Sequence, residues 1–210
     1  LRDHGELADS LASYHKALAI KPDFAEAHDN LGHVLKDLGK LEEAVSSYHK
    51  ALAIKPDYAE AHNNLGNAFK ALGRSKEAVA HYRKAIDLKP DYAMAHNNLG
   101  GALQALGQID DAINSYQKAL AFKPDFGEAQ YNLGTALLDP DDLAPAIQCM
   151  EKAVDIDPSN TNYRSVLGML WDYSGNPEKA TTHFDMVEKG ASLHRLELDA
   201  WRYITCATNK

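Results

Sequence analysis

The sequence predicts an all-α solenoid, which is a stack of antiparallel helix pairs. The stretch from Ala61 to Pro90 has one similar copy before it, from Ala27, and another after it, from Ala95, at equal spacing. Its apolar residues recur every three or four positions, which is the spacing of one face of an α-helix. A glycine in the middle of each unit and a proline at its end divide it into two helices of about thirteen residues. Such a unit buries its apolar face only against its neighbours, so we expect one continuous solenoid.

The anchor residues of the unit keep this spacing along most of the chain, without insertion or deletion. A Leu-Gly pair recurs at Leu31-Gly32, Leu65-Gly66, Leu99-Gly100, Leu133-Gly134 and Leu167-Gly168. The bulky residue of the second helix is Tyr14, Tyr48, Tyr82, Tyr116, Met150 and Phe184. Because glycine has no side chain, we expect neighbouring helices to approach closely at each Leu-Gly pair.

We expect the chain to open with a partial repeat, residues 1–24, whose helix runs from Glu6 to Ile20. Leu1 to His4 would be the tail of a first helix, so we expect the chain to be a fragment of a longer protein. Whole repeats follow at 25–58, 59–92, 93–126, 127–160 and 161–194. Each repeat is predicted to contain a helix, a tight turn and a second helix.

Local residues indicate where these helices begin and end. Glycines that take a left-handed conformation are expected to end the first helices at Gly39, Gly73, Gly107 and Gly175. Lys-Pro-Asp breaks each second helix, and the aspartate has the spacing of a capping box in the pairs Asp23 with Glu26, Asp57 with Glu60, and Asp125 with Glu128. Asn176 followed by Pro177 predicts another helix start.

The last two repeats depart from the pattern. The fourth turn runs from Leu138 to Pro145 and has Asp141 where glycine is expected. Two interpretations stay open for this stiffer, more acidic turn: a local variant, or a bend in the solenoid. The fifth repeat drifts further, and residues 195–210 then follow. The apolar positions of this end, which include Leu193, Leu196, Ala200, Trp201 and Ile204, share one face, so we predict a capping helix or a lead into another domain.

These anchors resemble the tetratricopeptide repeat family over residues 1–194. The usual aromatic residue three positions before Leu-Gly is replaced by His28, His62, His96, Gln130 and Arg164. The resemblance implies a right-handed superhelix whose first helices line the concave side. The sequence motif AHNNLG most resembles the repeats that precede the catalytic domain of O-GlcNAc transferases and related bacterial proteins.

The composition narrows the functional class. A formal net charge of −8 disfavours a nucleic-acid or anionic-membrane partner, since both need a basic face. No apolar run approaches the ~20 residues of a membrane span, and no signal peptide opens the chain. Cys149 and Cys206 form neither a disulfide framework nor a metal-binding pair, and Cys149 is expected to be a buried thiol. A reducing, cytoplasmic setting fits this usage.

Polar residues beside the Leu-Gly pairs form columns that repeat with the helices. The first column is Asn30, Asn64, Asn98 and Asn132, and the second is Asp29, Asn63, Asn97 and Tyr131. Further along stand His33, Asn67, Gly101 and Thr135, and then Lys36, Lys70 and Gln104. Asparagine carries a donor and an acceptor on one planar amide, as a peptide bond does. The first column therefore predicts binding of an extended peptide backbone, and the resemblance implies this role for it, because O-GlcNAc transferases carry an asparagine ladder at matching places.

These residues also allow other interpretations. The asparagines have an equal structural interpretation, in which they bond neighbouring backbone. The carboxylate-clamp members of the family have a key lysine where Asp29, Asn63 and Asn97 stand here, so a clamp is disfavoured. Because His28, His62 and His96 lie one helix-pair spacing of ~10 Å or more apart, they are expected to pack rather than to bind a metal. We expect no catalytic residue and no cofactor, since each candidate is explained by the repeat.

We therefore predict a protein–protein interaction scaffold, without enzymatic activity of its own, that binds an extended or helical peptide in a concave groove. The residues expected at the peptide are Asn30, Asn64, Asn98, Asn132, Asn63, Asn97, His33, Asn67, Lys36 and Lys70. Two alternatives stay open. The chain is the substrate-recruiting arm of a larger glycosyltransferase or methyltransferase, or it self-associates through open solenoid ends.

Overall fold

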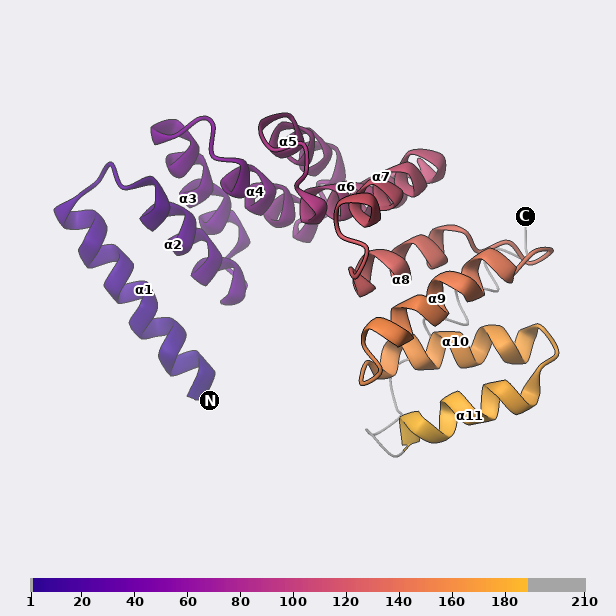
Figure 1. The fold of residues 1–210 in the computed structure, drawn as a ribbon. Coiled ribbons are helices and arrows are strands. Elements are labelled where there is room, and N and C mark those ends of the chain that lie inside the picture. Colours follow the sequence, from indigo (N-terminus) through magenta and orange to yellow (C-terminus); the bar gives the residue numbers. More distant parts are fainter. Residues whose placement is uncertain (1, 189–210) are drawn as a thin grey trace. The chain divides into compact units, whose positions relative to one another are not determined.

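The computed structural model describes residues 2–188, which form α-helices joined by short turns and carry no β-strand (Figure 1). The helices are α1 (Arg2–Ile20), α2 (Ala25–Asp37), α3 (Leu41–Ile54), α4 (Ala59–Ala71), α5 (Ser75–Leu88), α6 (Ala93–Ala105), α7 (Ile109–Phe122), α8 (Gly127–Ala136), α9 (Ala144–Ile156), α10 (Thr161–Tyr173) and α11 (Pro177–Glu188). The chain divides into two compact units, Leu1–Gln108 and Ile109–Lys210. This confirms the predicted all-α class for the described residues.

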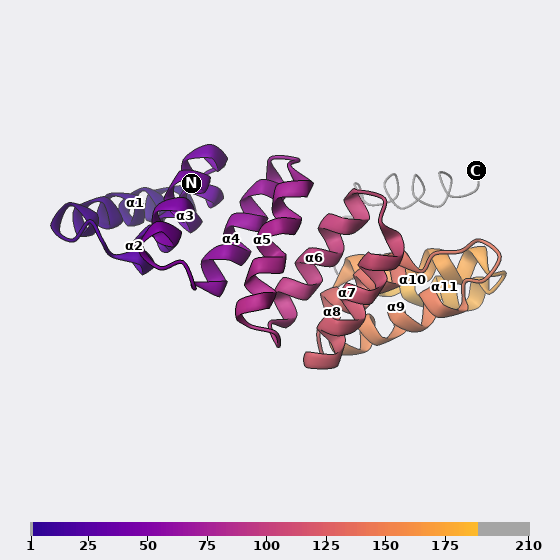
Figure 2. The same ribbon diagram turned by 90° about the horizontal axis from the view of Figure 1, so that it is seen from above.

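Within the first unit, consecutive helices pack as antiparallel hairpins. Helix α2 packs against α3 and α4 against α5, while α3 contacts α4 and α5 contacts α6 (Figure 2). The first helices of successive hairpins also touch, since α2 contacts α4 and α4 contacts α6. Polar residues at one position of these first helices are therefore neighbours across the repeats.

The second unit is built in the same way. Helix α7 packs on α8, α8 and α9 form one hairpin, and α10 and α11 form another that packs on α9 (Figure 1). Its core is formed by α9 and α10, with Met150 and Leu167 almost fully buried. Tyr131, Leu143 and Trp171 pack against this core from its edge.

The tight turns confirm the sequence prediction. The four turn glycines have φ values of +75°, +73°, +75° and +79°, at Gly39, Gly73, Gly107 and Gly175 respectively. The variant fourth turn has no glycine and is closed by the Asp142 N–H, which donates to the Asp139 carbonyl at 3.1 Å. The helices on both sides of this turn still pair, so the hairpin survives the substitution of Asp141 for glycine.

At Gly32, Gly66, Gly134 and Gly168 the Leu-Gly pair lets an aromatic ring or a methionine reach the helix backbone. A Cβ on Gly32 would lie 2.6 Å from the Tyr48 ring, and a Cβ on Gly66 would lie 2.6 Å from the Tyr82 ring. Both tyrosines are fully buried. Glycine is therefore required at this position, as the predicted close approach demands.

The start of the chain differs from the prediction. Helix α1 runs without a break from Arg2 through Gly5 to Ile20, where the sequence predicts a helix that begins at Glu6. Continuing the existing helix adds a backbone hydrogen bond for each residue that joins it, which explains the extension.

The predicted capping boxes are wrong. The N-cap residue of α2, α4 and α8 is the aromatic Phe24, Tyr58 or Phe126, and none of the three helices has a side-chain cap. For the preceding aspartate to be the N-cap, each helix would have to begin one residue earlier than it does. Instead, a lysine of the Lys-Pro-Asp turn lies over the aromatic ring at 4.6–5.0 Å, in the pairs Lys21 with Phe24, Lys55 with Tyr58, Lys89 with Tyr92 and Lys123 with Phe126. Only α10 has a side-chain cap among the helices whose caps are described, where Asn160 accepts from the backbone of Asn162 and Tyr163.

Three further expectations concern the C-terminal end, the cysteines and membrane-spanning helices. The predicted capping helix at 195–210 and Cys206 lie outside the described residues. Cys149 is a free, buried thiol, and burial raises its pKa. Over the described helices, none combines the length and the apolar character that crossing a membrane requires.

Candidate functional site

The polar columns of the first unit stand on α2, α4 and α6. In the first column, Asn30 is exposed while Asn64 and Asn98 are half-buried. In the second column, Asp29, Asn63 and Asn97 are buried, with exposed fractions of 5%, 1% and 2%. The two columns are adjacent in sequence but differ sharply in their access to solvent.

Hydrogen bonds join the two columns across the repeats. Asn64 Nδ2 donates to both carboxylate oxygens of Asp29, at 3.1 and 3.3 Å. Asn98 Nδ2 donates to Asn63 Oδ1 at 2.9 Å. Each bond spans 35 residues, one more than the repeat, because the first column of one repeat reaches the second column of the repeat before it.

These bonds hold the half-buried amides of Asn64 and Asn98 in place. Because a carboxylate oxygen only accepts, the bond to Asp29 turns Nδ2 of Asn64 toward it, whereas Asn98 pairs its Nδ2 with the Oδ1 of another amide. One Nδ2 hydrogen is used in the bond, while the second hydrogen and the carbonyl oxygen make no other hydrogen bond that the structure describes. The structural and ligand-binding interpretations of the column are therefore compatible.

We call these two hydrogen bonds, Asn64 to Asp29 and Asn98 to Asn63, the rungs of a ladder. Asp29 makes the first rung chemically different from the second. Burial raises the pKa of its carboxyl above the ordinary value, and the hydrogen bond from Asn64 and the nearby His33 partly oppose that shift. The rung between α2 and α4 is therefore an acid–amide pair, and the rung between α4 and α6 is an amide–amide pair.

In the next polar column, which contains His33 and Asn67, one residue bonds to a tyrosine of the core. Asn67 Oδ1 accepts a hydrogen bond of 2.8 Å from the Tyr82 hydroxyl. The equivalent hydroxyl of Tyr48 is buried without a partner among the described residues, and His33 stands one repeat before Asn67 and is exposed. Burial raises the pKa of both tyrosine hydroxyls.

The two lysines expected at the peptide lie in the last turns of α2 and α4. Lys36 is half-buried and its Nζ lies 3.7 Å from Asp37, whereas Lys70 is exposed. A cation at this end of a helix also interacts favourably with the helix dipole. Their position therefore has a structural explanation beside the predicted one.

The histidine that replaces the usual aromatic residue closes the Lys-Pro-Asp turn. His28 and His96 use Nε2 to bind the carbonyls of Pro22 and Pro90 at 2.9 Å. His62 binds the Pro56 carbonyl at 3.2 Å, and Arg164 donates to the Pro158 carbonyl in the same way at 2.6 Å. Because each ring serves its own turn, the column is explained by packing, and no metal-binding group is found in the part of the chain that the structure describes.

The sequence pattern located the columns but did not reveal their pairing. The recurrence of both columns was visible in the sequence, yet nothing there indicated that one column donates to the other. Asn132 and Tyr131 lie on α8 in the second unit, where the Tyr131 ring packs against the ring of Tyr163 with centroids 5.2 Å apart. The ladder bonds named above therefore belong to the first unit.

Comparison with known families gives one consistent match. A family model described as TPR repeat matches residues 1–39, 32–73, 66–107 and 102–139. A second, described as tetratricopeptide repeat, matches residues 127–160. A search of curated proteins found no match.

Solved structures with this architecture are similar over most of the chain. MamA from Desulfovibrio magneticus RS-1 is 27% identical, with a TM-score of 0.68, over 79% of this chain and 93% of that chain. PilF from Pseudomonas aeruginosa is 24% identical, with a TM-score of 0.75, over 88% and 87%. YrrB, described as a TPR protein with an unusual peptide-binding site, is 23% identical, with a TM-score of 0.64, over 93% and 97%. The likeness to PilF and YrrB is evidence for the fold alone.

Proposed function

The chain belongs to the tetratricopeptide repeat family, and from that premise we propose that it is a protein-interaction scaffold. We propose that an extended segment of a partner protein lies across α2, α4 and α6 and binds the side-chain amides of Asn64 and Asn98. The observation that carries this proposal is the anchored ladder, in which each amide is held by the repeat before it.

The chemistry of an anchored amide suits a peptide backbone. The carbonyl oxygen of Asn98 accepts a peptide N–H, and its second Nδ2 hydrogen donates to a peptide carbonyl. Because the bond to Asn63 already holds the side chain, little rotamer entropy is lost when a peptide binds. Such contacts read the backbone, so they impose little sequence preference.

The spacing of the ladder also suits an extended chain. Packed helices lie about 8–10 Å apart, and an extended peptide advances about 3.3 Å per residue. Successive rungs therefore match about every third residue of the bound segment. Asn30, His33 and Lys70 lie at the exposed edge of the same helices and provide further contacts. Asn63 and Asn97, which are buried, act in this proposal by holding or supporting the ladder.

The test separates the amide that binds from the residue that holds it. Peptides are selected from a phage-displayed random library with the wild-type chain, and their affinity is measured by fluorescence anisotropy. Asn98→Ala removes the binding amide and is expected to weaken the peptide about tenfold, which is the loss of about 1.4 kcal/mol. Asn63→Ala leaves that amide in place but unanchored, so a smaller loss is expected.

Controls separate a loss of peptide affinity from a loss of folding stability in the variants. Both substitutions remove the same bond between α4 and α6, but Asn98→Ala also leaves the buried Asn63 side chain without this partner, so urea denaturation measures the loss of folding stability of each variant separately. Asn114→Ala, an exposed asparagine on α7, is the matched substitution outside the ladder and should bind as wild type. Equal weakening by Asn63→Ala and Asn98→Ala would show that the ladder acts only through stability and would contradict the proposal.

The alternative function is a substrate-recruiting arm. It rests on the AHNNLG wording, which resembles the repeats of O-GlcNAc transferases, and it uses the same ladder to deliver a substrate to a glycosyltransferase or methyltransferase domain encoded elsewhere in the gene. Sequencing the gene on both sides of residues 1–210 tests it, since a catalytic domain in the same reading frame is required. Self-association through the ends is tested by light scattering over a concentration series, where a constant monomer mass would exclude it.

A further inference from the structure

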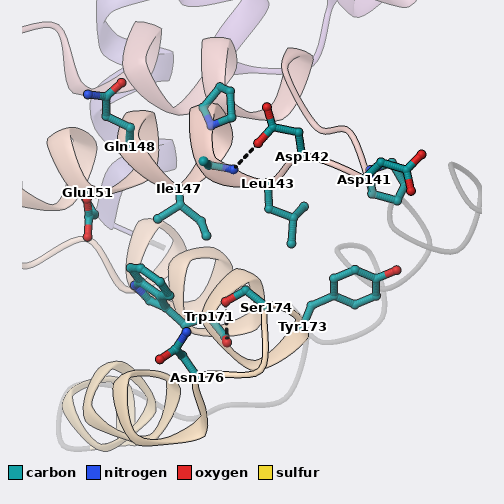
Figure 3. Close-up of a pocket in the computed structure, with 13 residues that line it drawn as sticks. Asp141, Asp142, Leu143, Ile147, Gln148, Glu151, Trp171, Tyr173, Ser174 and Asn176 are labelled. Atoms are coloured by element: carbon teal, nitrogen blue, oxygen red, sulfur yellow. Dashed lines mark hydrogen bonds between the residues drawn. The ribbon is translucent and has the colours of Figure 1, made fainter.

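A hollow of about 890 Å³ opens in the second unit, between the variant fourth turn and the end of α10 (Figure 3). The turn contributes Asp141, Asp142 and Leu143 on one side, and α10 contributes Trp171 and Tyr173 on the other. Ile147 of α9 lies between the two sides. The two departures from the repeat that the sequence shows, in the fourth and fifth repeats, therefore meet at one place.

A missing leucine explains part of this space. The residue that follows each first helix in the first unit is a half-buried leucine, at Leu38, Leu72 and Leu106. The equivalent residue after α10 is Ser174, which is exposed and lines the hollow. A serine in place of leucine removes most of an apolar side chain, so the neighbouring hairpins leave room where the other repeats fill it.

The apolar walls of the hollow are held by the core. Ile147 is buried and belongs to the cluster that α9 and α10 share, and Leu143 and Trp171 pack against that cluster. Tyr173 is 49% exposed, so the hollow presents an aromatic ring to solvent. Large apolar side chains that remain exposed next to a rigid core are typical of a docking surface.

The charge of the lining is of one sign. Asp141, Asp142 and Glu151 line the hollow, while no lysine, arginine or histidine of the described residues does. The Asp142 side chain is held in place because its Oδ1 accepts from the backbone N–H of Ala144 at 3.2 Å. Beside the hollow, Lys179 Nζ lies 3.7 Å from the centroid of the Trp171 ring, so this indole already binds one cation of the chain itself.

We propose that this hollow binds an arginine side chain of a partner protein. A guanidinium group is planar, stacks on aromatic faces and pairs with carboxylates, which is the combination that Tyr173 and the acidic rim provide. Its aliphatic stem suits the apolar floor at Leu143 and Ile147. The site goes beyond the proposed function, because it lies in the second unit and uses none of the ladder residues.

The experiment titrates the full-length chain with N-acetyl-arginine amide and follows the indole N–H signals by NMR. The chain has two tryptophans, and Trp201→Phe leaves Trp171 as the source of the one indole signal. A saturable shift of that signal with a dissociation constant of about 1 mM is expected, as for a single small ligand. N-acetyl-citrulline amide, which has the same shape without the charge, should give no saturable shift.

Two variants place the binding in the hollow. Ser174→Leu introduces the residue that the repeats of the first unit have at this position, occupies part of the space, and should raise the dissociation constant about tenfold or more. Ser46→Leu, an exposed serine on α3 in the other unit, is the matched control and should leave it unchanged. The pair Asp141→Asn with Asp142→Asn removes two charges at nearly constant shape. The amide oxygen that replaces the Asp142 carboxylate still accepts from the Ala144 N–H, so folding is retained while binding weakens.

Three results would overturn the proposal: equal shifts with arginine and citrulline amides, unchanged affinity in Ser174→Leu, or unchanged affinity in the double aspartate variant. Circular dichroism checks that Ser174→Leu is folded, and the double aspartate variant decides the question alone if it is not. Asn98→Ala should bind the arginine amide as wild type does. A failure of this site and a failure of the asparagine ladder are therefore distinguishable.

Discussion

Asn98 donates its side-chain amide to Oδ1 of Asn63 at 2.9 Å, and this bond ties α6 to α4 across 35 residues of sequence. One repeat earlier, Asn64 makes the same bond to Asp29, where a buried carboxylate replaces the amide. The molecule thus contains one interaction in a neutral and in an ionisable form. The comparison of the two forms gives the first prediction.

Asp29→Asn should stabilise the chain near neutral pH by about 1 kcal/mol, because asparagine still accepts from Asn64 and no charge is buried. The folded-state pKa of Asp29 lies above its ordinary value, so its favourable contribution is present at low pH and is lost as the pH rises through that pKa. The gain from Asp29→Asn should therefore shrink as the pH is lowered. Urea denaturation at neutral and acidic pH measures it.

Asn63→Asp is the matched reverse substitution, since it places the carboxylate in the second rung. It should destabilise the chain at neutral pH by a similar amount and recover at acidic pH. Loss of stability in Asp29→Asn at neutral pH would instead mean that the charge-assisted bond from Asn64 outweighs the cost of burial.

The second prediction concerns two tyrosines in equivalent positions. The Tyr82 hydroxyl donates to Asn67 at 2.8 Å, whereas the Tyr48 hydroxyl is buried and has no partner among the described residues. Tyr82→Phe should therefore cost about 1 kcal/mol more folding stability than Tyr48→Phe, because it also leaves the Asn67 carbonyl without its donor. Chemical denaturation of the two variants at neutral pH gives the difference.

His33→Asn tests the same account from the other side. It places an asparagine one repeat before Asn67, within the pattern that serves Tyr82, and should stabilise the chain by about 1 kcal/mol in the wild-type background. In the Tyr48→Phe background the gain should vanish. A gain that persists without the hydroxyl would have to come from helix propensity or from removal of the histidine.

The constant period of the repeat made the helix pairs, the turn glycines and the approach at Leu-Gly predictable. These features depend on residues close together in sequence, or on a glycine that nothing else replaces, as at Gly66 against Tyr82. The aspartate caps failed because the helices begin one residue further on, as at α4, where Tyr58 and not Asp57 is the N-cap, and a repeat pattern does not define helix ends to one residue.

The hydrogen bonds between the two polar columns could not be predicted from the repeat pattern. Whether Asn98 reaches Asn63 depends on the rotation of α6 against α4, which is set by packing of the whole interface and not by the polar residues themselves. The hollow beside Ser174 was equally hidden, because it arises from departures in two different repeats, at Asp141 and Ser174, and from a turn shape the period does not define. Sequence periodicity predicts the structure of the average repeat, whereas a site such as this hollow forms where single repeats depart from that average.

The third prediction separates two uses of glycine. At Gly66 the helix is regular but an added Cβ would lie 2.6 Å from the Tyr82 ring, so Gly66→Ala should cost about 1–3 kcal/mol through overpacking. At Gly73 no atom lies within 4 Å of the added Cβ, but φ is +73°, so Gly73→Ala should cost about 1–2 kcal/mol through backbone strain. Both costs are measured by urea denaturation.

A second substitution tells the two mechanisms apart. Tyr82→Leu removes the ring that opposes the new methyl group, so the added cost of Gly66→Ala should be smaller in that background. The cost of Gly73→Ala should be the same in both backgrounds, because nothing packs on it. Equal costs of Gly66→Ala with and without the ring would contradict the overpacking explanation.

The last prediction arises from a hydrogen bond between two histidines on α4 and α5. The Nδ1 atoms of His62 and His81 lie 3.2 Å apart, and His62 Nε2 binds the Pro56 carbonyl at 3.2 Å. Because a carbonyl only accepts, His62 Nε2 carries a proton, so the Nδ1 of a neutral His62 accepts and the Nδ1 of His81 donates. The ring of Phe69 lies 5.4 Å from that of His81, and the exposed His49 lies 6.1 Å from it.

This environment disfavours protonation. Burial, followed by the charges of His62 and His49, lowers the pKa of His81 to about 4, and burial likewise lowers the pKa of His62, with Lys84 and His49 adding to the effect. A histidine whose pKa is lower in the folded than in the unfolded state binds fewer protons when folded, so stability falls as the pH drops from about 6.5 to about 4. Because His81 is only half-buried, solvent screening reduces the expected loss to about 1 kcal/mol.

His81→Gln removes the titrating group while its amide still donates to His62, so the variant should lose less stability than wild type between pH 7 and pH 5. Urea denaturation at both pH values measures the two slopes. His15→Gln, an exposed position on α1 and away from this pair, is the matched control and should leave the slope unchanged. If His81→Gln kept the full wild-type slope, the acid sensitivity would have to come from other groups, and the hydrogen bond between His62 and His81 would not be its source.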